Sequence, residues 1–114
     1  MSKDYRVYLR DILDAAGSIG EYTLDMSYEE FSGRKMVSDA VIMNLAVIGE
    51  SAKKIPASVK KKYPTVDWRG VAGLRDVVVH KYSSLNLKVI WDILENELPE
   101  LKSTVKTMLE DYEA

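Results

Sequence analysis

The segment R-K-M-V-S-D-A-V-I-M-N-L-A-V-I-G-E-S-A-K-K at residues 34–54 has the pattern of a helix with two apolar stripes. The first stripe consists of Met36, Ala40, Met43 and Val47. The second, beside it, consists of Val37, Val41, Leu45, Ile48 and Ala52. At about 100° per residue, the two stripes together cover roughly half of the circumference, whereas a surface helix needs a narrower stripe. This helix therefore either lies at the centre of a bundle or meets a second copy of the chain through its second stripe.

The rest of the chain also shows helical periodicity. We expect a helix over about residues 3–23, a short one from Pro56 to residue 62, one over 68–82, and two from residue 87 onward that Pro99 kinks or separates. The side chains expected to be buried in the three longer regions are Tyr5, Leu9, Ile12, Leu13, Ala16, Ile19, Val71, Leu74, Val78, Val89, Ile90, Ile93, Leu94, Leu101, Val105, Met108 and Leu109, with Trp91 at a packing edge.

Capping residues in the sequence mark where several of these helices begin. Ser27 followed by Glu30 is a capping-box pattern, and Asp67 and Asn86 suit the N-caps of the helices that follow them. No stretch alternates polar and apolar residues long enough to predict a strand. The expected fold is an all-α, antiparallel bundle of four to five helices, formed by residues 1–114 as one domain.

Composition excludes several classes of site. The 114 residues contain no cysteine and one histidine, which excludes disulfides, thiolate nucleophiles, Cys-based zinc sites and a multi-histidine metal site within one chain. We expect no metal and no cofactor. No apolar run approaches the roughly 20 residues that span a bilayer, and residues 1–10 are too polar for a signal peptide. A cytoplasmic protein with no membrane partner is expected.

Charge is distributed unevenly along the chain. Residues 51–81 contain 8 Lys and Arg against 2 Asp and Glu, a net charge of +6. The flanking residues 1–50 and 92–114 have net charges of −4 and −5. The basic segment is either a solvated lysine face or a local positive field that gathers a phosphate-bearing ligand.

The histidine lies at the end of this basic segment, in G-L-R-D-V-V-V-H-K-Y at residues 73–82. Arg75 precedes His80 by five positions, about 140° around an ideal helix, so the two do not share a face. A site that uses both needs the long reach of arginine, a helix that frays near His80, or residues from a second chain. A lone histidine near a helix end is most often structural or exposed.

Four segments resemble HEPN-domain toxins of the HepT type, which are ribonucleases paired with the nucleotidyltransferase antitoxin MntA. Residues 75–82 match the family signature R-x-x-x-x-H-x-Y. The other three segments are I-G-E-S-A-K-K at 48–54, Y-P-T-V-D-W-R-G-V-A-G-L-R-D at 63–76 and V-I-W-D-I-L-E-N-E-L-P-E-L at 89–101. R-x-x-x-x-H alone is a weak signal, but the four segments in this order and spacing are specific.

The resemblance implies an HEPN-like helical domain that forms a homodimer and brings two motifs into one cleft. It implies a toxin of a type VII-like toxin–antitoxin system that cleaves RNA, such as tRNA or mRNA, without a metal. Arg75 and His80 would be catalytic: His80 would take the proton of the 2′-hydroxyl, and Arg75 would bind the scissile phosphate. An MntA-type antitoxin would silence the enzyme by attaching AMP to Tyr82, giving O-AMP-tyrosine.

The motif departs from the family at three positions. Asp76 stands where asparagine is usual, Val77 replaces a residue that is commonly basic or polar, and Lys81 replaces a frequent glycine. Asp76 and Lys81 are candidates for supporting residues of the site. Two alternatives to catalysis are a helical interaction module that holds a nucleotidyltransferase, and a cleft that binds a free nucleotide without cleaving RNA.

Overall fold

The structure is a computed structural model that describes residues 4–81 and 86–113, without the side chains of Val77, Val79, His80, Lys81 and Glu113. The helices in these residues are α1 (Arg6–Tyr22), α2 (Tyr28–Gly33), α3 (Lys35–Lys53), α4 (Ala57–Lys60), α5 (Trp68–Lys81), α6 (Leu87–Asn96) and α7 (Leu98–Glu113). All regular structure in the described ranges is helical, which confirms the predicted all-α class.

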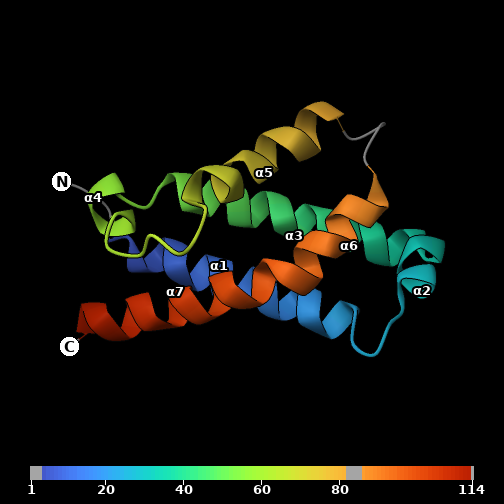
Figure 1. Cartoon of the computed structure of the whole chain (residues 1–114), viewed down its shortest axis with the longest axis horizontal. Helices are drawn as coiled ribbons and strands as arrows, with labels where there is room; N and C mark the ends of the chain where they lie inside the picture. The colour runs from blue at the N-terminus through green and yellow to red at the C-terminus, as the bar shows by residue number, and fades with distance from the viewer. Residues whose placement is uncertain (1–3, 82–85, 114) are drawn as a thin grey trace.

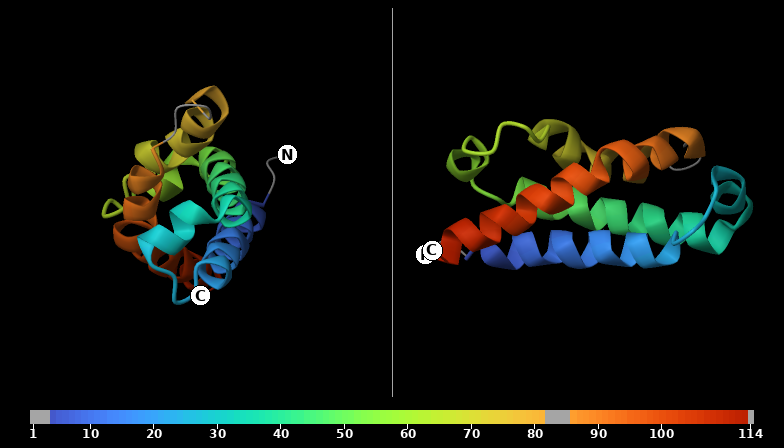
Figure 2. Two further views of the ribbon diagram at one scale, coloured as in Figure 1. Left: turned by 90° about the vertical axis from the view of Figure 1, so that its right-hand side faces the viewer. Right: turned by 60° about the horizontal axis from the view of Figure 1, so that its bottom comes forward.

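Helices α1, α3 and α5 alternate in direction, and α6 and α7 return together in the direction opposite to α5 (Figure 1). Helix α3 lies between α1 and α5 and packs more extensively against these two than any other pair of helices packs. Helix α7 packs along α1, and the short helix α2 contacts α3 and α6 at one end of the bundle (Figure 2). The predicted helical bundle is therefore confirmed.

The core explains why α3 carries two apolar stripes. Its second stripe supplies Val41, Leu45 and Ile48, which are fully buried. The first stripe remains at the surface, because Met36 and Met43 are 88% and 66% exposed. Helix α3 is thus central in the bundle, and the expectation that its second stripe meets another copy is wrong, because that stripe is buried and the first stripe is the one open to solvent. The remaining buried apolar residues come mainly from α1 and α7: Leu9, Ile12, Ala15, Ala16, Ile19, Leu98, Leu101, Val105 and Met108.

The predicted caps are present. The Ser27 hydroxyl accepts a hydrogen bond from the Glu30 amide, and the Glu30 carboxylate accepts one from the Ser27 amide. The Asp67 carboxylate accepts from the Gly70 amide at 3.0 Å, and the Asn86 side chain accepts from the Lys88 amide at 2.9 Å. These side chains satisfy amides that have no partner within the helix. The interruption predicted near Pro99 also occurs, since α6 ends at Asn96 and α7 begins at Leu98.

One predicted core position is wrong. Val89 is 55% exposed, because α6 packs through Ile90 and Trp91 against its neighbours and turns Val89 away from them. The Trp91 ring lies 5.0 Å from the ring of Phe31, as expected for a residue at a packing edge. Val71 and Leu74 are only half-buried, although both pack against the core. Across the described residues, no helix combines the length and apolar character needed to cross a membrane.

Candidate active site

The start of α5 is fixed by two side chains. Asp67 caps the helix, and the buried Trp68 donates a hydrogen bond from its indole nitrogen to the Tyr63 carbonyl at 3.0 Å. Because the helix begins at Trp68, Arg75 and Asp76 lie in its middle, on the side that faces α3. The local sequence thus sets where the arginine of the motif is presented.

Gly49 allows α3 and α5 to approach closely at Arg75. A Cβ atom at Gly49 would lie 2.7 Å from the Arg75 backbone nitrogen and 3.1 Å from the Val71 carbonyl oxygen. Real Cβ atoms essentially never make a contact as short as 2.7 Å, and the contact at 3.1 Å is tighter than most. The absence of a side chain at Gly49 is therefore what lets the Arg75 backbone rest against α3.

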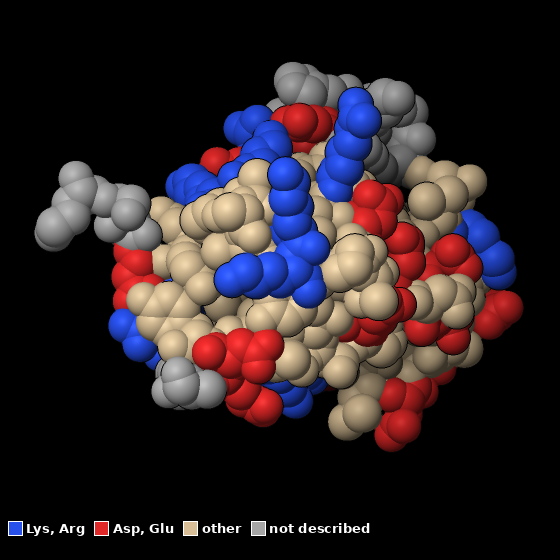
Figure 3. Space-filling view, turned by 60° about the vertical axis from the view of Figure 1, so that its left-hand side comes forward, with Lys and Arg blue, Asp and Glu red and all other residues tan. Residues whose placement is uncertain are grey.

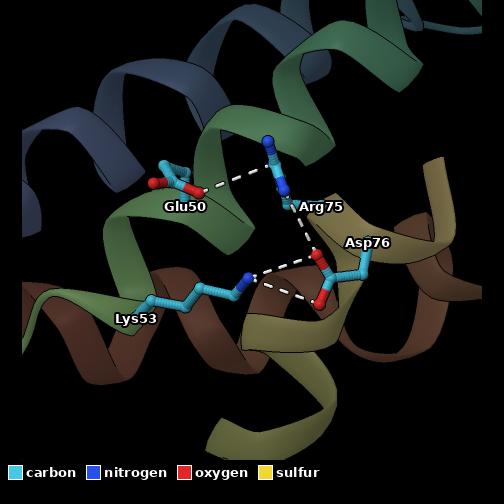
Figure 4. A network of polar contacts seen from close by, with 4 residues as sticks. All are labelled: Glu50, Lys53, Arg75 and Asp76. Atoms are coloured by element: carbon cyan, nitrogen blue, oxygen red, sulfur yellow. Dashed lines mark hydrogen bonds and ion pairs between the residues drawn. The ribbon is translucent and has the colours of Figure 1, made fainter. Parts of the chain in front are cut away.

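Four charged side chains meet where these helices cross (Figure 4). Glu50 and Lys53 come from α3, and Arg75 and Asp76 come from α5. The Lys53 ammonium lies 3.3 Å from each oxygen of the Asp76 carboxylate. Arg75 donates from Nη1 to Asp76 Oδ1 at 3.4 Å, and its Nε lies 3.7 Å from Glu50 Oε2. We call these four residues the Arg75 network.

The network is open to solvent and electrically balanced. The Arg75 side chain is 43% exposed and that of Asp76 is 51% exposed. Two positive and two negative charges are present, so the network has no net charge. The hydrogen bonds and charge of Lys53, and to a smaller extent those of Arg75, lower the pKa of Asp76 below its usual value. Asp76 is therefore ionised at neutral pH and shared between two cations.

The structure describes the side chains of two of the five predicted site residues, Arg75 and Asp76. Arg75 and Asp76 lie on one exposed surface together. His80 and Lys81 belong to the last turn of α5, but their side chains lie outside the described part of the structure, as does the whole of Tyr82. The prediction that Arg75 and His80 share a site therefore stays a prediction.

Sequence reasoning missed the partners of Arg75 on α3. Gly49, Glu50 and Lys53 all belong to the segment 48–54 that carries part of the family resemblance. That resemblance was a signal for these residues, but their contact with α5 depends on how two helices pack.

Basic side chains gather near the α4 end of the molecule. Figure 3 brings this end forward and shows several Lys and Arg side chains on the upper part of the face, with acidic side chains among them and on its lower and right-hand parts. The basic residues of this region of the chain are Lys53, Lys54, Lys60, Lys61, Lys62 and Arg69. Besides Lys53, which pairs with Asp76, two of them make contacts within the chain: Lys60 donates to the Ala52 carbonyl at 3.0 Å, and the Lys54 ammonium lies 5.6 Å from the centre of the Tyr8 ring.

An apolar cavity of about 240 Å³ lies on another side of α5. Its lining residues are Leu45, Ile48, Gly70, Val71, Leu74, Ile93, Glu97, Leu98 and Leu101. Such a lining does not suit a phosphate, since it offers no cation. Among the residues described, no group of three or more His, Asp or Glu side chains is placed to hold a metal ion.

Comparison with known proteins identifies the family. Residues 12–108 match the model of the family described as "Ribonuclease HepT-like". The chain is 40% identical to "Putative RNase MJ0127" of Methanocaldococcus jannaschii over 97% of its own length and 92% of that protein's. It is 35% identical to "Probable ribonuclease HepT" of Thermococcus cleftensis over 90% of its own length and 93% of that protein's. No solved structure matches the chain significantly.

These matches cover nearly the whole chain and agree with its all-α fold, so the predicted HepT-type HEPN family and the predicted ribonuclease class are confirmed. The chain belongs to the HepT-like ribonuclease family.

Proposed function

We propose that this protein is the toxin of a type VII-like toxin–antitoxin system, a cytoplasmic endoribonuclease that needs no metal. In this proposal residues 1–114 act as one HEPN-like domain, and RNA is cut at a cleft shared by two copies of the chain. The observation that carries the proposal is an arginine with a 43% exposed side chain at the R-x-x-x-x-H-x-Y motif of a chain that belongs to a ribonuclease family. The basic surface near α4 supports it, because a positive field attracts an RNA backbone.

The exposed stripe of α3 supports a homodimer. Met36, Met43 and Val47 are 88%, 66% and 40% exposed, and they share one face of α3. Glu50 continues this face one turn further and contacts Arg75. A two-fold interface along the stripe would cover apolar surface and bring two Arg75 networks close together. It would also supply the second histidine that a single chain lacks.

The chemistry assigned to this cleft is cleavage through the 2′-hydroxyl. The His80 imidazole removes the 2′-hydroxyl proton, and the 2′-oxygen attacks the adjacent phosphorus. The bond from phosphorus to the 5′-oxygen breaks, and His80 of the second copy or a water molecule protonates that oxygen. The guanidinium of Arg75 stabilises the charge that builds on the phosphate oxygens. The products are a 2′,3′-cyclic phosphate and a 5′-hydroxyl.

Tyr82 is the proposed site of control. An MntA-type nucleotidyltransferase would transfer AMP from ATP to the Tyr82 hydroxyl and release pyrophosphate. The added phosphodiester charge and nucleoside would hinder anionic RNA from entering the cleft. Co-expression with the partner should add one or more AMP masses to the intact protein. The absence of this mass shift from wild-type protein, or its persistence in Tyr82→Phe, would refute the assignment.

The ribonuclease proposal is tested by incubating the purified protein with tRNA and total RNA. Cleavage should persist in EDTA and be lost in Arg75→Ala. If the wild-type protein leaves RNA intact, calorimetry with ATP and AMP separates the alternatives. Heat of nucleotide binding would favour a nucleotide-binding module, and its absence would favour a helical module that holds the nucleotidyltransferase.

A further inference from the structure

We propose that Lys53 is a positioning residue of the Arg75 site. By pairing with the Asp76 carboxylate, Lys53 leaves the Arg75 guanidinium available to bind a phosphate of RNA. This inference rests on the proposed function, because it assigns RNA phosphate to Arg75. It adds a residue from α3 that lies outside the R-x-x-x-x-H-x-Y motif and acts through its neighbour.

The distances show how Asp76 is divided between the two cations. Both of its oxygens lie 3.3 Å from the Lys53 ammonium, whereas only one lies within hydrogen-bond distance of Arg75, at 3.4 Å. Arg75 is therefore not engaged in the two-pronged pairing that makes arginine–carboxylate contacts strong. Its other carboxylate neighbour, Glu50, lies 3.7 Å away, which is beyond hydrogen-bond distance.

Lys53 matters because Asp76 is adjacent to Arg75 in the chain and competes with phosphate for the same donors. Without Lys53 the network would change from no net charge to a net charge of −1. Asp76 would then be free to turn both of its oxygens toward Arg75. Each change opposes binding of an anionic RNA backbone. The lowered pKa of Asp76, caused first by its hydrogen bonds with Lys53, agrees with this pairing.

Close helix packing makes this pairing possible. Lys53 lies one turn after Gly49 on α3, and Gly49 is where the backbones of α3 and α5 nearly touch. The lysine thereby reaches across to α5 from a helix that does not carry the motif. A substitution at Lys53 removes the counter-ion of Asp76 without altering Arg75 itself.

The test is a double-mutant cycle on RNA binding. The probe is a fluorescent 2′-O-methyl RNA, which has no 2′-hydroxyl and cannot be cleaved by the proposed route. Lys53→Met should weaken binding about threefold when Asp76 is present, a factor typical of an exposed ion pair. In the Asp76→Asn background the same change should weaken binding clearly less, because only the charge of Lys53 is then lost. Asp76→Asn alone should strengthen binding.

Lys54→Met is the matched control, because it removes the same charge one residue further along, where the ammonium lies over Tyr8. Lys54→Met should change RNA binding by the same factor in the wild-type background and in the Asp76→Asn background. If Lys53→Met weakens binding equally in both backgrounds, Lys53 only adds charge and the positioning role is overturned. If Lys53 only supported the fold, Lys53→Met would weaken RNA binding and Asp76→Asn would not restore it. That result would also overturn the positioning role.

Cleavage of ordinary RNA is measured on the same variants and separates the two proposals. If the four proteins of the cycle show the predicted coupling in probe binding but the wild type cleaves no RNA, the ribonuclease proposal fails and the positioning role is supported. If it cleaves RNA and shows no coupling between Lys53 and Asp76, the ribonuclease proposal is supported and the positioning role fails. Absence of both activities would overturn both.

Discussion

Replacing Gly49 by alanine should destabilise the fold, although alanine is the better helix former. Ordinary contact for a Cβ atom begins at 3.4 Å, so its approach of 2.7 Å to the Arg75 nitrogen would be about 0.7 Å too short. The obstacle is helix backbone, which cannot rotate away as a side chain can. Overpacking of this kind costs about 1–3 kcal/mol, and replacing a helical glycine by alanine returns about 0.5–1 kcal/mol. We expect Gly49→Ala to lower the free energy of unfolding by up to about 2.5 kcal/mol.

Gly17→Ala provides the control for this experiment. Gly17 also lies inside a long helix, but a Cβ atom there would have no atom within 4 Å beyond the backbone of its own helix and its two chain neighbours. This substitution should therefore raise the free energy of unfolding by about 0.5–1 kcal/mol. Urea denaturation of both variants beside the wild type measures the difference. If Gly49→Ala stabilises the protein as Gly17→Ala does, the close approach of α3 and α5 at Arg75 is refuted.

Three further perturbations test other parts of the structure. Asp67→Ala removes the cap of α5 and should lower the free energy of unfolding in urea by about 1 kcal/mol, and an unchanged midpoint would contradict the cap. Met43→Asp places a charge on the exposed stripe of α3 and should convert the proposed homodimer to monomers in light scattering, whereas an unaltered dimer would place the interface elsewhere. The Tyr63 hydroxyl donates to Asp111 at 2.5 Å, and this bond, together with burial and the charge of Asp111, raises the pKa of Tyr63 to about 12. Because the folded pKa exceeds the unfolded value of 10.0, the stabilisation is complete below pH 10 and is lost as the pH rises toward 12. Tyr63→Phe should therefore cost about 0.5–1.5 kcal/mol at neutral pH, and the difference from wild type should vanish across that window; a difference that does not depend on pH would refute the assignment.

The helices and their ends could be predicted because their causes are local. Ser27, Asp67 and Asn86 each bond an amide two or three residues further along the chain, so sequence spacing alone indicates the cap. The apolar stripes follow from the helical repeat in the same way. Val89 could not be assigned correctly, because whether it is buried depends on which neighbours cover α6.

The candidate site was predictable only in part for the same reason. Arg75 could be singled out by its motif, but Glu50 and Lys53 lie more than 20 positions away in sequence. They meet Arg75 and Asp76 because Gly49 lets two helices approach closely, which is a property of packing. The two apolar stripes of α3 left open whether the helix is central or meets a second copy of the chain, and only the fold shows which stripe is buried and which is exposed.

The most direct measurement is cleavage of RNA by the wild-type protein and by His80→Ala in the presence of EDTA, with the ends of the fragments identified by mass. We predict that the wild type produces fragments ending in 2′,3′-cyclic phosphate and 5′-hydroxyl and that His80→Ala produces none. Activity that survives in His80→Ala, or that EDTA abolishes in the wild type, would contradict a metal-independent ribonuclease built on this motif.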